Sequence, residues 1–238
     1  MQGLKKSPFS YTTFPLFKKF PELLHATFLS PHDFSDHNIE RMAKKIVKEW
    51  NLDGFIYCNQ IHQNNIHIVK KIGKNSIFCL SHTDALITEQ KNIILCVRHA
   101  DCQAALLYDK CNQVIAIVHA GWKGLVGNIY RKVINAMEKK FSTHPENLFV
   151  CVSPSLGPTA SKYIHYREVF PKYFYKFQIA PFHFDFWQLG KYQLSEMGIP
   201  TNNIAISEIC TFSNAEYFSY RRTKTKMRNA SLIGIRNK

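Results

Sequence analysis

Residues 93–124 read IILCVRHADCQAALLYDKCNQVIAIVHAGWKG, and this stretch decides the fold that the sequence predicts. Two apolar runs in it, residues 93–97 and 114–118, have the length and the β-branched content of buried strands. The first run leads into Ala100-Asp101-Cys102, and the second leads into His119-Ala120-Gly121-Trp122. We therefore expect a thiol and an imidazole at the ends of neighbouring strands, where they suit either a metal site or a nucleophile–base pair.

The sequence on either side of this stretch mixes strand and helix patterns. An amphipathic helix is predicted over Ile39–Trp50 with Asn38 as its N-cap, and a second helix follows Gly124, where residues 125–137 keep helical spacing. Shorter apolar runs predict strands at residues 55–58, 66–69, 84–88, 148–152 and 203–209, and a strand or a helix at residues 104–108. Because strands and helices do not alternate strictly, we expect an α+β fold with mixed sheets, in a single domain over residues 1–238.

Composition and charge limit the class of protein. The 238 residues carry a net charge of +14, and no stretch approaches the ~20 apolar residues of a membrane helix. Seven cysteines without close pairs indicate a reducing compartment, and the first residues lack the apolar core of a signal peptide, so we expect a cytoplasmic protein without disulfides. The charge favours a small anionic ligand over nucleic acid, because no nucleic-acid-binding module accompanies it, although a merely basic surface explains it equally well.

His62 adds a third candidate to the pair at the strand ends. Like Cys102 and His119, it follows an apolar, strand-like run, and side chains at strand ends often form sites. Two histidines and one cysteine are a ligand set of catalytic zinc, which keeps a fourth position for water. The alternative is a buried cysteine with histidines on the surface, and the wide spacing along the chain leaves both interpretations open.

The turn that follows His119 is a candidate anion site. Gly121 and Gly124 bracket Trp122 at a strand-to-helix junction, where free backbone N–H groups gather, and Lys123 adds a positive charge. The alternative is a tight turn that needs small residues, with the lysine on the surface.

Further polar positions are candidates for binding or for support of the site. Asp101 either orients a histidine or a substrate amine, or caps a helix. Asp84 lies in a strand-like run, where Asp is depleted, and therefore needs a partner. Arg221 and Arg222 follow Tyr217-Phe218-Ser219-Tyr220, so this segment either stacks a base and holds an anion, or supplies core aromatics and leaves the arginines exposed.

Five segments, in order, resemble the motifs of one protein family and span about residues 55 to 235. Asn59-Gln60-Ile61-His62 resembles its Gln-Val-His-Gly segment. The others are residues 83–88 (Asp-Ala-Leu-Ile-Thr in the family), 100–102 (Ala-Asp-Cys), 119–124 (His-Ala-Gly-Trp-Arg-Gly), and 210–211 with 218–222 (Cys-Thr and Phe-Ser-Tyr-Arg-Arg). The family was long labelled laccase-domain or multicopper polyphenol oxidase-like and was later reassigned as purine nucleoside phosphorylases with adenosine deaminase activity. Its bacterial members have also been called peptidoglycan editing factors.

This resemblance implies a fold, a metal and an activity. The implied fold is layered α/β/β/α, with mixed sheets flanked by helices, and the implied metal is zinc, with copper less favoured. The implied enzyme uses phosphate to cleave adenosine, inosine, guanosine or methylthioadenosine and deaminates adenosine. The implied zinc ligands are His62, Cys102 and His119. We assign catalytic roles to these three and to Asp101, and binding of substrate or phosphate to Gly121, Trp122, Lys123, Asp84, Arg221 and Arg222.

The chain departs from the family motifs at several positions. Gln63 replaces a glycine, Ala104 replaces a proline, and Lys123 replaces an arginine, which keeps the charge but loses the bidentate fork. The Gly157-Pro158-Thr159-Ala160-Ser161 segment lacks a cysteine, and residues 223–226 lack the usual acidic residue and glycine. None of these changes affects the three expected zinc ligands.

Three other functions compete with the zinc enzyme. A cysteine hydrolase would use Cys102 as nucleophile and His119 or His62 as base, acting on peptidoglycan precursors or other amides. A copper polyphenol oxidase would need many histidines, commonly in His-X-His pairs, and none occurs here. A basic nucleotide-binding protein without catalysis is the third, and polar groups at several strand ends argue against it.

Overall fold

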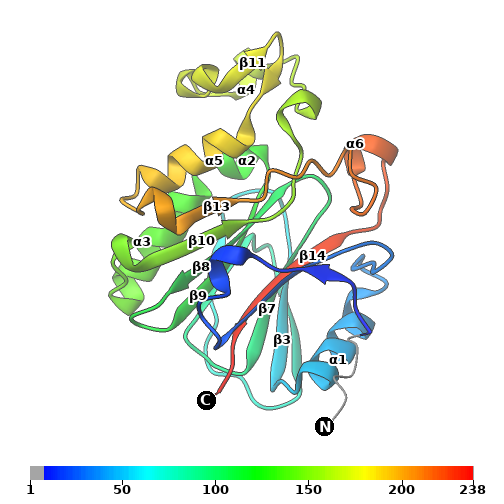
Figure 1. Ribbon diagram of the computed structural model, residues 1–238, viewed down its shortest axis with the longest axis vertical. Helices are drawn as coiled ribbons and strands as arrows, with labels where there is room; N and C mark the ends of the chain where they lie inside the picture. Colours follow the sequence, from blue (N-terminus) through cyan, green and yellow to red (C-terminus); the bar gives the residue numbers. More distant parts are fainter. Residues whose placement is uncertain (1–7, 238) are drawn as a thin grey trace.

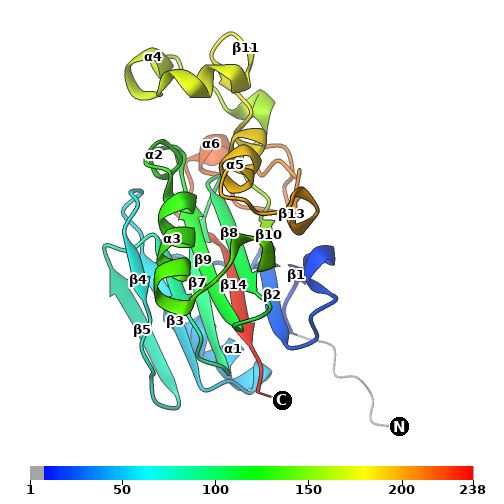
Figure 2. The same ribbon diagram turned by 90° about the vertical axis from the view of Figure 1, so that its left-hand side faces the viewer.

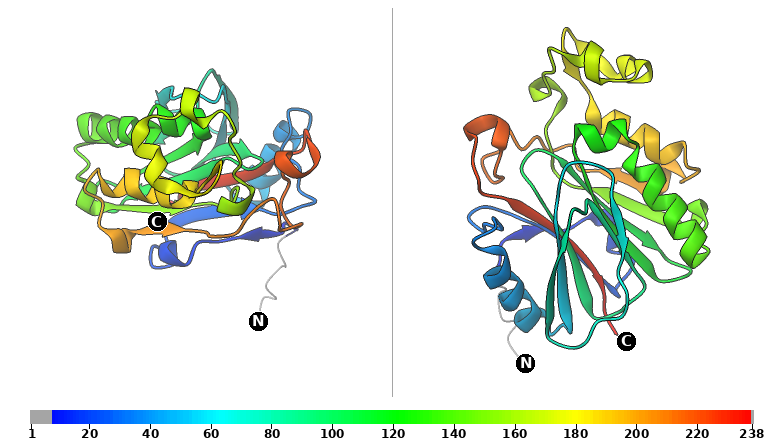
Figure 3. Two further views of the ribbon diagram at one scale, coloured as in Figure 1. Left: turned by 90° about the horizontal axis from the view of Figure 1, so that it is seen from above. Right: turned by 180° about the vertical axis from the view of Figure 1, so that it is seen from behind.

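The computed structural model describes residues 8–237, and a six-stranded sheet with the strand order β1-β2-β14-β7-β3-β5 runs through it. The strands are β1 (Tyr11–Thr12), β2 (Leu23–Phe28), β14 (Asn229–Ile235), β7 (Ile93–His99), β3 (Gly54–Asn59) and β5 (Ser76–Ser81). β14 pairs antiparallel with β2 and β7, whereas β3 pairs parallel with β7 and β5, so the sheet is mixed as expected. The view from behind in Figure 3 shows β14 in red, crossing the middle of the molecule.

A second six-stranded sheet has the order β13-β10-β8-β9-β6-β4. Its strands are β13 (Ile204–Ile206), β10 (Leu148–Val152), β8 (Gln103–Asp109), β9 (Val114–Ala120), β6 (Ala85–Thr88) and β4 (Ile66–Ile68). β8 and β9 form an antiparallel hairpin, while β10 with β13 and β4 with β6 are parallel pairs. β8 pairs with both β9 and β10, so the run left open as strand or helix is a strand, and it is buried along its whole length.

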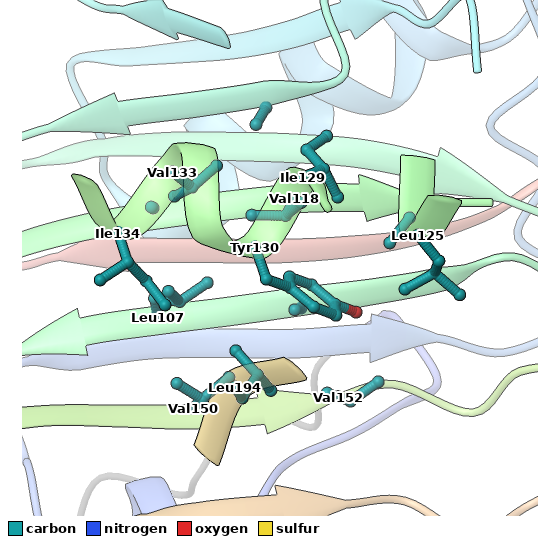
Figure 4. Packing of buried hydrophobic residues seen from close by; sticks show 14 of the residues in the cluster. Leu107, Val118, Leu125, Ile129, Tyr130, Val133, Ile134, Val150, Val152 and Leu194 are labelled. Carbon is teal, nitrogen blue, oxygen red and sulfur yellow. The ribbon is translucent and has the colours of Figure 1, made fainter. Parts of the chain in front are cut away.

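Helices cover the outer faces of the two sheets, which gives the α/β/β/α layers that the resemblance implies (Figures 1 and 2). α1 (Ile39–Trp50) packs on the first sheet, and α3 (Ile129–Phe141) and α5 (Phe186–Ser195) pack on the second. Between the sheets lies a separate core with residues from both, including Leu95, Leu106 and Ile117. Figure 4 shows one face of α3 turned toward β8, β9 and β10, with Ile129, Tyr130, Val133 and Ile134 near Leu107, Val118 and Val150.

Two details of the helices differ from the sequence prediction. The side chain of Asn38 donates a hydrogen bond to the carboxylate of Asp33, 2.8 Å away, and makes no cap bond to α1. The helix predicted after Gly124 is two helices, because α2 (Trp122–Val126) ends before Asn128, whose φ is 48°. The side chain of Asn64 donates to the carbonyl of Gly127 at this break, and α3 then starts with Asn128 accepting from the backbone N–H of Arg131.

The strand predicted over residues 203–209 is shorter in the structure and is limited to β13. Residues 158–186 form a lobe at the top of Figure 1 that the sequence did not predict. The lobe contains α4 (Tyr166–Val169) and the small sheet of β11 (Gln178–Ala180) and β12 (His183–Phe184). α6 (Tyr220–Thr223) is a single turn close to β14 in the chain. Short 3-10 segments lie at Pro15–Phe17, Pro145–Asn147, Pro158–Ala160, Lys172–Phe177 and Thr201–Asn203. Among residues 8–237, no helix has the length and apolar character needed to cross a membrane.

Candidate metal centre and its cavity

Three side chains from different parts of the chain meet at one end of the paired sheets. His119 lies near the end of β9, Cys102 lies in the turn between β7 and β8, and His62 follows β3. Their potential ligand atoms all lie within 4.8 Å of one another. In the β8–β9 hairpin, Ala104 lies opposite His119, so Cys102, two residues before Ala104, lies near His119 at the end of the second sheet. His62 follows β3, which belongs to the first sheet. The site therefore bridges the two sheets.

Asp84, just before β6, has the partner that the sequence predicted for it, and that partner is His119. Its carboxylate is fully buried and lies 2.9 Å from Nδ1 of His119. It also accepts hydrogen bonds from the backbone N–H groups of His62, at 3.0 Å, and Gln63, at 2.9 Å. A carboxylate on Nδ1 selects the tautomer with its proton there and leaves Nε2 free to bind a metal. Asp84 thus supports two of the three ligands, and contact with substrate stays a prediction.

The protonation states of Cys102 and His119 depend on each other. Burial alone would raise the pKa of the Cys102 thiol, but the charge and hydrogen bonds of His119, and then of His62, lower it to about 6. Burial alone would lower the pKa of His119, but the Cys102 thiolate and the Asp84 carboxylate raise it to about 9. Without a metal ion, the two groups therefore form a thiolate–imidazolium pair at neutral pH.

This donor set fits a zinc ion. Thiolate sulfur and imidazole nitrogen are zinc ligands, and the carboxylate behind His119 is the support that such histidines usually have. Gly121 leaves the space that the site needs, because a Cβ there would lie 3.1 Å from Sγ of Cys102 and 3.5 Å from the His62 ring. The identity of the metal does not follow from these contacts, so zinc belongs to the proposal below.

A cavity of about 550 Å³ opens onto the three side chains. Trp122, Tyr163, Phe186 and Tyr220 contribute aromatic rings to its walls, and the rings of Tyr163 and Phe186 are 5.1 Å apart. Tyr163 and Phe186 come from the two ends of the projecting lobe. A pocket of this size with aromatic walls suits a ligand the size of a nucleoside.

Asp101 connects the turn that contains Cys102 with segments that are distant in the sequence. Its carboxylate accepts hydrogen bonds from Oγ1 of Thr211, at 2.7 Å, and from the backbone N–H of Arg221, at 2.6 Å. Its carbonyl accepts from the backbone N–H of Leu156, at 2.8 Å, and its φ of 91° is unusual for a residue other than glycine. The carboxylate therefore accepts a hydrogen bond from the first turn of α6 without being part of that helix. The catalytic role expected for Asp101 stays a prediction.

The two adjacent arginines lie in different surroundings. The guanidinium of Arg222 donates hydrogen bonds to four backbone carbonyls, those of Thr211, Phe212, Asn214 and Tyr217. Arg221 lines the cavity, where its guanidinium lies 5.8 Å from the centre of the Tyr163 ring. The structure thus joins Arg222 to the fold of residues 211–217 and leaves Arg221 able to contact a ligand.

The predicted anion turn is divided in the same way. Gly121 and Trp122 line the cavity, while Lys123 is exposed, lies outside its lining and has its ammonium 5.5 Å from the Trp122 ring. α2, which begins at this turn, has only five residues. Binding of phosphate by Lys123 stays a prediction.

Sequence reasoning missed several polar residues of the cavity, among them Arg98, His99 and Arg228. Arg98 and His99 stand between an apolar strand and the Asp-Cys pair, and a charged residue at the buried end of a strand was a signal. His99 is buried and bonds through Nε2 to the hydroxyl of Ser231, and burial lowers its pKa to about 3. Arg228 ends the dense basic run of residues 221–228, and that run by itself is as typical of an exposed surface as of a site.

Comparison with known proteins gives one family. Residues 31–236 match the family model described as multi-copper polyphenol oxidoreductase laccase. The chain is 34% identical over 157 residues to a purine nucleoside phosphorylase of Bacteroides thetaiotaomicron, a match that covers 62% of this chain and 58% of that protein. It is 32% identical over 185 residues to a purine nucleoside phosphorylase of Campylobacter jejuni, covering 76% of this chain and 77% of the relative.

A solved structure shares the fold. The crystal structure of YlmD from Geobacillus stearothermophilus superposes with a TM-score of 0.82, covers 98% of each chain and is 18% identical in sequence. This likeness shows that the two-sheet architecture is the fold of that protein as well.

Proposed function

This chain belongs to the family described as multi-copper polyphenol oxidoreductase laccase, and from that premise we propose that it is a zinc-dependent purine nucleoside phosphorylase that also deaminates adenosine. Relatives named purine nucleoside phosphorylase support the first activity. The observation that carries the proposal is the meeting of His62, Cys102 and His119 beside a cavity with aromatic walls. Its substrates would be phosphate and a purine nucleoside: adenosine, inosine, guanosine or methylthioadenosine.

The residues that would hold zinc are His62, Cys102 and His119, which leaves a fourth position for water or substrate. When bound, zinc lowers the pKa of its water toward ~7. Asp84 holds the Nδ1 proton of His119 and fixes the backbone of His62, so that both rings keep their orientation. Cys102 contributes a thiolate, because its pKa is already below neutral pH.

In phosphorolysis, an oxygen of phosphate bonds to C1′ of the ribose while the bond from C1′ to the purine breaks. The purine leaves with the electron pair and takes up a proton. Trp122, Tyr163 and Phe186 would hold the base by stacking and edge contacts. Their rings would also shield C1′ from bulk water, which favours attack by phosphate over hydrolysis.

Deamination would use the same bound nucleoside. A water oxygen bonds to C6 of the adenine, one proton of the water passes to the exocyclic amino group, and the bond from C6 to that nitrogen breaks as ammonia leaves. This reaction needs an activated water beside the base, and the site can supply one because its three ligands lie in the wall of the cavity. One cavity can therefore serve both reactions.

The test is an assay of the purified protein with adenosine, inosine, guanosine and methylthioadenosine, with and without phosphate, together with metal analysis. We expect about one zinc per chain, and we expect His62→Ala, Cys102→Ala and His119→Ala each to abolish both activities. Full phosphorolysis by a metal-free Cys102→Ala protein would overturn the proposal.

One observation favours a second candidate, a cysteine hydrolase. The depressed pKa of Cys102 and the Asp84 carboxylate on His119 arrange thiol, imidazole and carboxylate as in a nucleophilic triad. Metal analysis with alkylation separates the two candidates. Tightly held zinc and an unreactive Cys102 support the nucleoside enzyme, whereas a metal-free protein alkylated quickly at Cys102 supports the hydrolase.

A copper polyphenol oxidase finds less support in the site. Within residues 8–237, His62, Cys102 and His119 are the one group of three or more metal-ligating side chains that converges. Several copper centres would need many more histidines. Oxidation of a phenolic dye with stoichiometric bound copper would restore this alternative.

A further inference from the structure

The cavity is basic at a place that the proposed chemistry has not used. Arg98, Lys226 and Arg228 line it together with Arg221. The carboxylates in the lining belong to Asp36 and Asp101, and that of Asp101 already accepts hydrogen bonds from Thr211 and Arg221. This leaves Asp36 as the carboxylate that faces several cations. Such an excess of positive charge in a cavity attracts anions.

Arg98 is held in place but has donor capacity to spare. Its side chain is 10% exposed, and its backbone is fixed by the side-chain amide of Gln60 through two hydrogen bonds, of 2.6 and 3.0 Å. One guanidinium nitrogen donates to Asp36 at 2.5 Å and another donates to the carbonyl of Cys58 at 3.3 Å. Nε has no partner within the described part of the chain. A buried donor without a partner is costly, so an additional acceptor is expected beside it.

Asp36 is a weakly held partner for this arginine. It lies in the loop between β2 and α1, and its side chain is 85% exposed. An ion pair with so exposed a member is screened by water and contributes little to stability. The hydrogen bond and charge of Arg98, and then the charges of Arg228 and His37, lower the pKa of the Asp36 carboxyl. Arg98 contacts this carboxylate directly, and Arg228 lines the same cavity and acts on the same carboxylate through its charge.

We propose that the Asp36 carboxylate occupies the place of an oxyanion, and that phosphate binds there to Arg98 and Arg228 and displaces Asp36. This inference rests on the proposed function, since phosphate is the attacking group in phosphorolysis. Guanidinium groups suit it because they donate two parallel hydrogen bonds to a phosphate, which a lysine cannot do. The subsite uses other cations than the predicted anion turn, whose Lys123 lies outside the cavity lining.

The experiment measures binding of inorganic phosphate by equilibrium dialysis and, in parallel, the KM for phosphate in phosphorolysis. Asp36→Asn removes the internal competitor, so both the Kd and the KM for phosphate should fall about two- to fivefold, the range expected of an exposed ion pair. Arg228→Gln removes a donor to the anion, so both should rise at least tenfold, as for a charge-assisted hydrogen bond. Lys132→Gln, which removes an exposed charge from the outer helix α3, is the matched control and should change neither value.

The result that would overturn the subsite is a phosphate Kd that is unchanged in Asp36→Asn and Arg228→Gln but raised in Lys123→Gln, which would place phosphate at the turn instead. Adenosine 5′-monophosphate is the second probe. Arginine-dependent binding of this nucleotide, without binding of free phosphate, would also overturn the assignment to the co-substrate. Dialysis does not depend on turnover, so arginine-dependent phosphate binding by a protein that cleaves no nucleoside would support the subsite while refuting the proposed function.

Discussion

Replacement of Asp84 by asparagine tests how the site is held together. In Asp84→Asn, the amide oxygen can replace only one of the two carboxylate oxygens. If the oxygen faces His119 and the backbone N–H of His62, the new NH2 group faces the N–H of Gln63, donor against donor. If the amide is turned around, NH2 donates to Nδ1 of His119. The proton of that imidazole then moves to Nε2, the nitrogen that should bind the metal.

Both orientations have a measurable cost. An unsatisfied buried donor costs about 1–3 kcal/mol of unfolding free energy, and Asp84 is fully buried. Loss of the carboxylate behind a metal-binding histidine lowers metal affinity about 10- to 100-fold. We therefore expect Asp84→Asn to fold with reduced stability and to bind zinc at least tenfold more weakly than the wild type.

The assay is competition for zinc with a chromophoric chelator, with urea unfolding of the metal-free protein alongside. Asp109→Asn is the matched control, because Asp109 is also fully buried and accepts three hydrogen bonds, from Cys111 and Asn112, in the turn between β8 and β9. The control should lose stability but keep its zinc affinity. Wild-type zinc affinity in Asp84→Asn would refute the reasoning.

Four other predictions address the thiol, its pairing with His119, the space around it and the arginine network. In the metal-free protein, alkylation of Cys102 should be half-maximal near pH 6, because His119 lowers its pKa to about 6; a profile centred near 9 would contradict this. His119 offsets this shift in the pH dependence of stability, because its pKa rises to about 9 while that of Cys102 falls to about 6. The folded pair and the unfolded groups then bind nearly the same number of protons, so urea unfolding between pH 6 and 9 should show little change from this pair, and a steep rise in stability with pH would contradict the pairing. Gly121→Ala should weaken zinc binding in a titration without a large change in Tm, since its methyl group would lie 3.1 Å from Sγ of Cys102 while its φ of −75° suits any residue. Arg222→Ala should lower the unfolding free energy by about 2–3 kcal/mol, because the guanidinium donates to four carbonyls; an unchanged urea midpoint would argue against this network.

The sequence predicted elements whose pattern is decided locally. α1 has the predicted bounds, because its apolar residues recur on one face, and β9 is recognisable because it is apolar on both faces. β14 was missed because Asn229 and Ser231 interrupt its apolar pattern, although both side chains are buried with polar partners. Those partners, Thr27 and Phe218, come from other segments, so no local pattern could indicate them.

The same distinction applies to the site. The candidate ligands were recognisable as residue types at strand ends, but their convergence depends on two sheets that pack face to face, which spacing does not encode. The contact between Arg98 and Asp36 spans 62 positions of the chain and needs the loop before α1 to reach the end of β7. Arg222, by contrast, was expected to bind substrate. Its guanidinium donates to backbone carbonyls, and only the folded structure shows which ones.

The position of β14 has a consequence for biosynthesis. This strand lies between β2 and β7, so the first sheet stays divided until residues 229–235 have left the ribosome. The turn that contains Cys102 also depends on late residues, since the Asp101 carboxylate accepts hydrogen bonds from Thr211 and Arg221. The β8–β9 hairpin can bring Cys102 next to His119 before then, but a chain that stops short of residue 211 lacks the two partners that anchor the turn through the Asp101 carboxylate. Long-range pairing of this kind is typical of slower folding, and the first sheet is complete only when β14 has paired with β2 and β7.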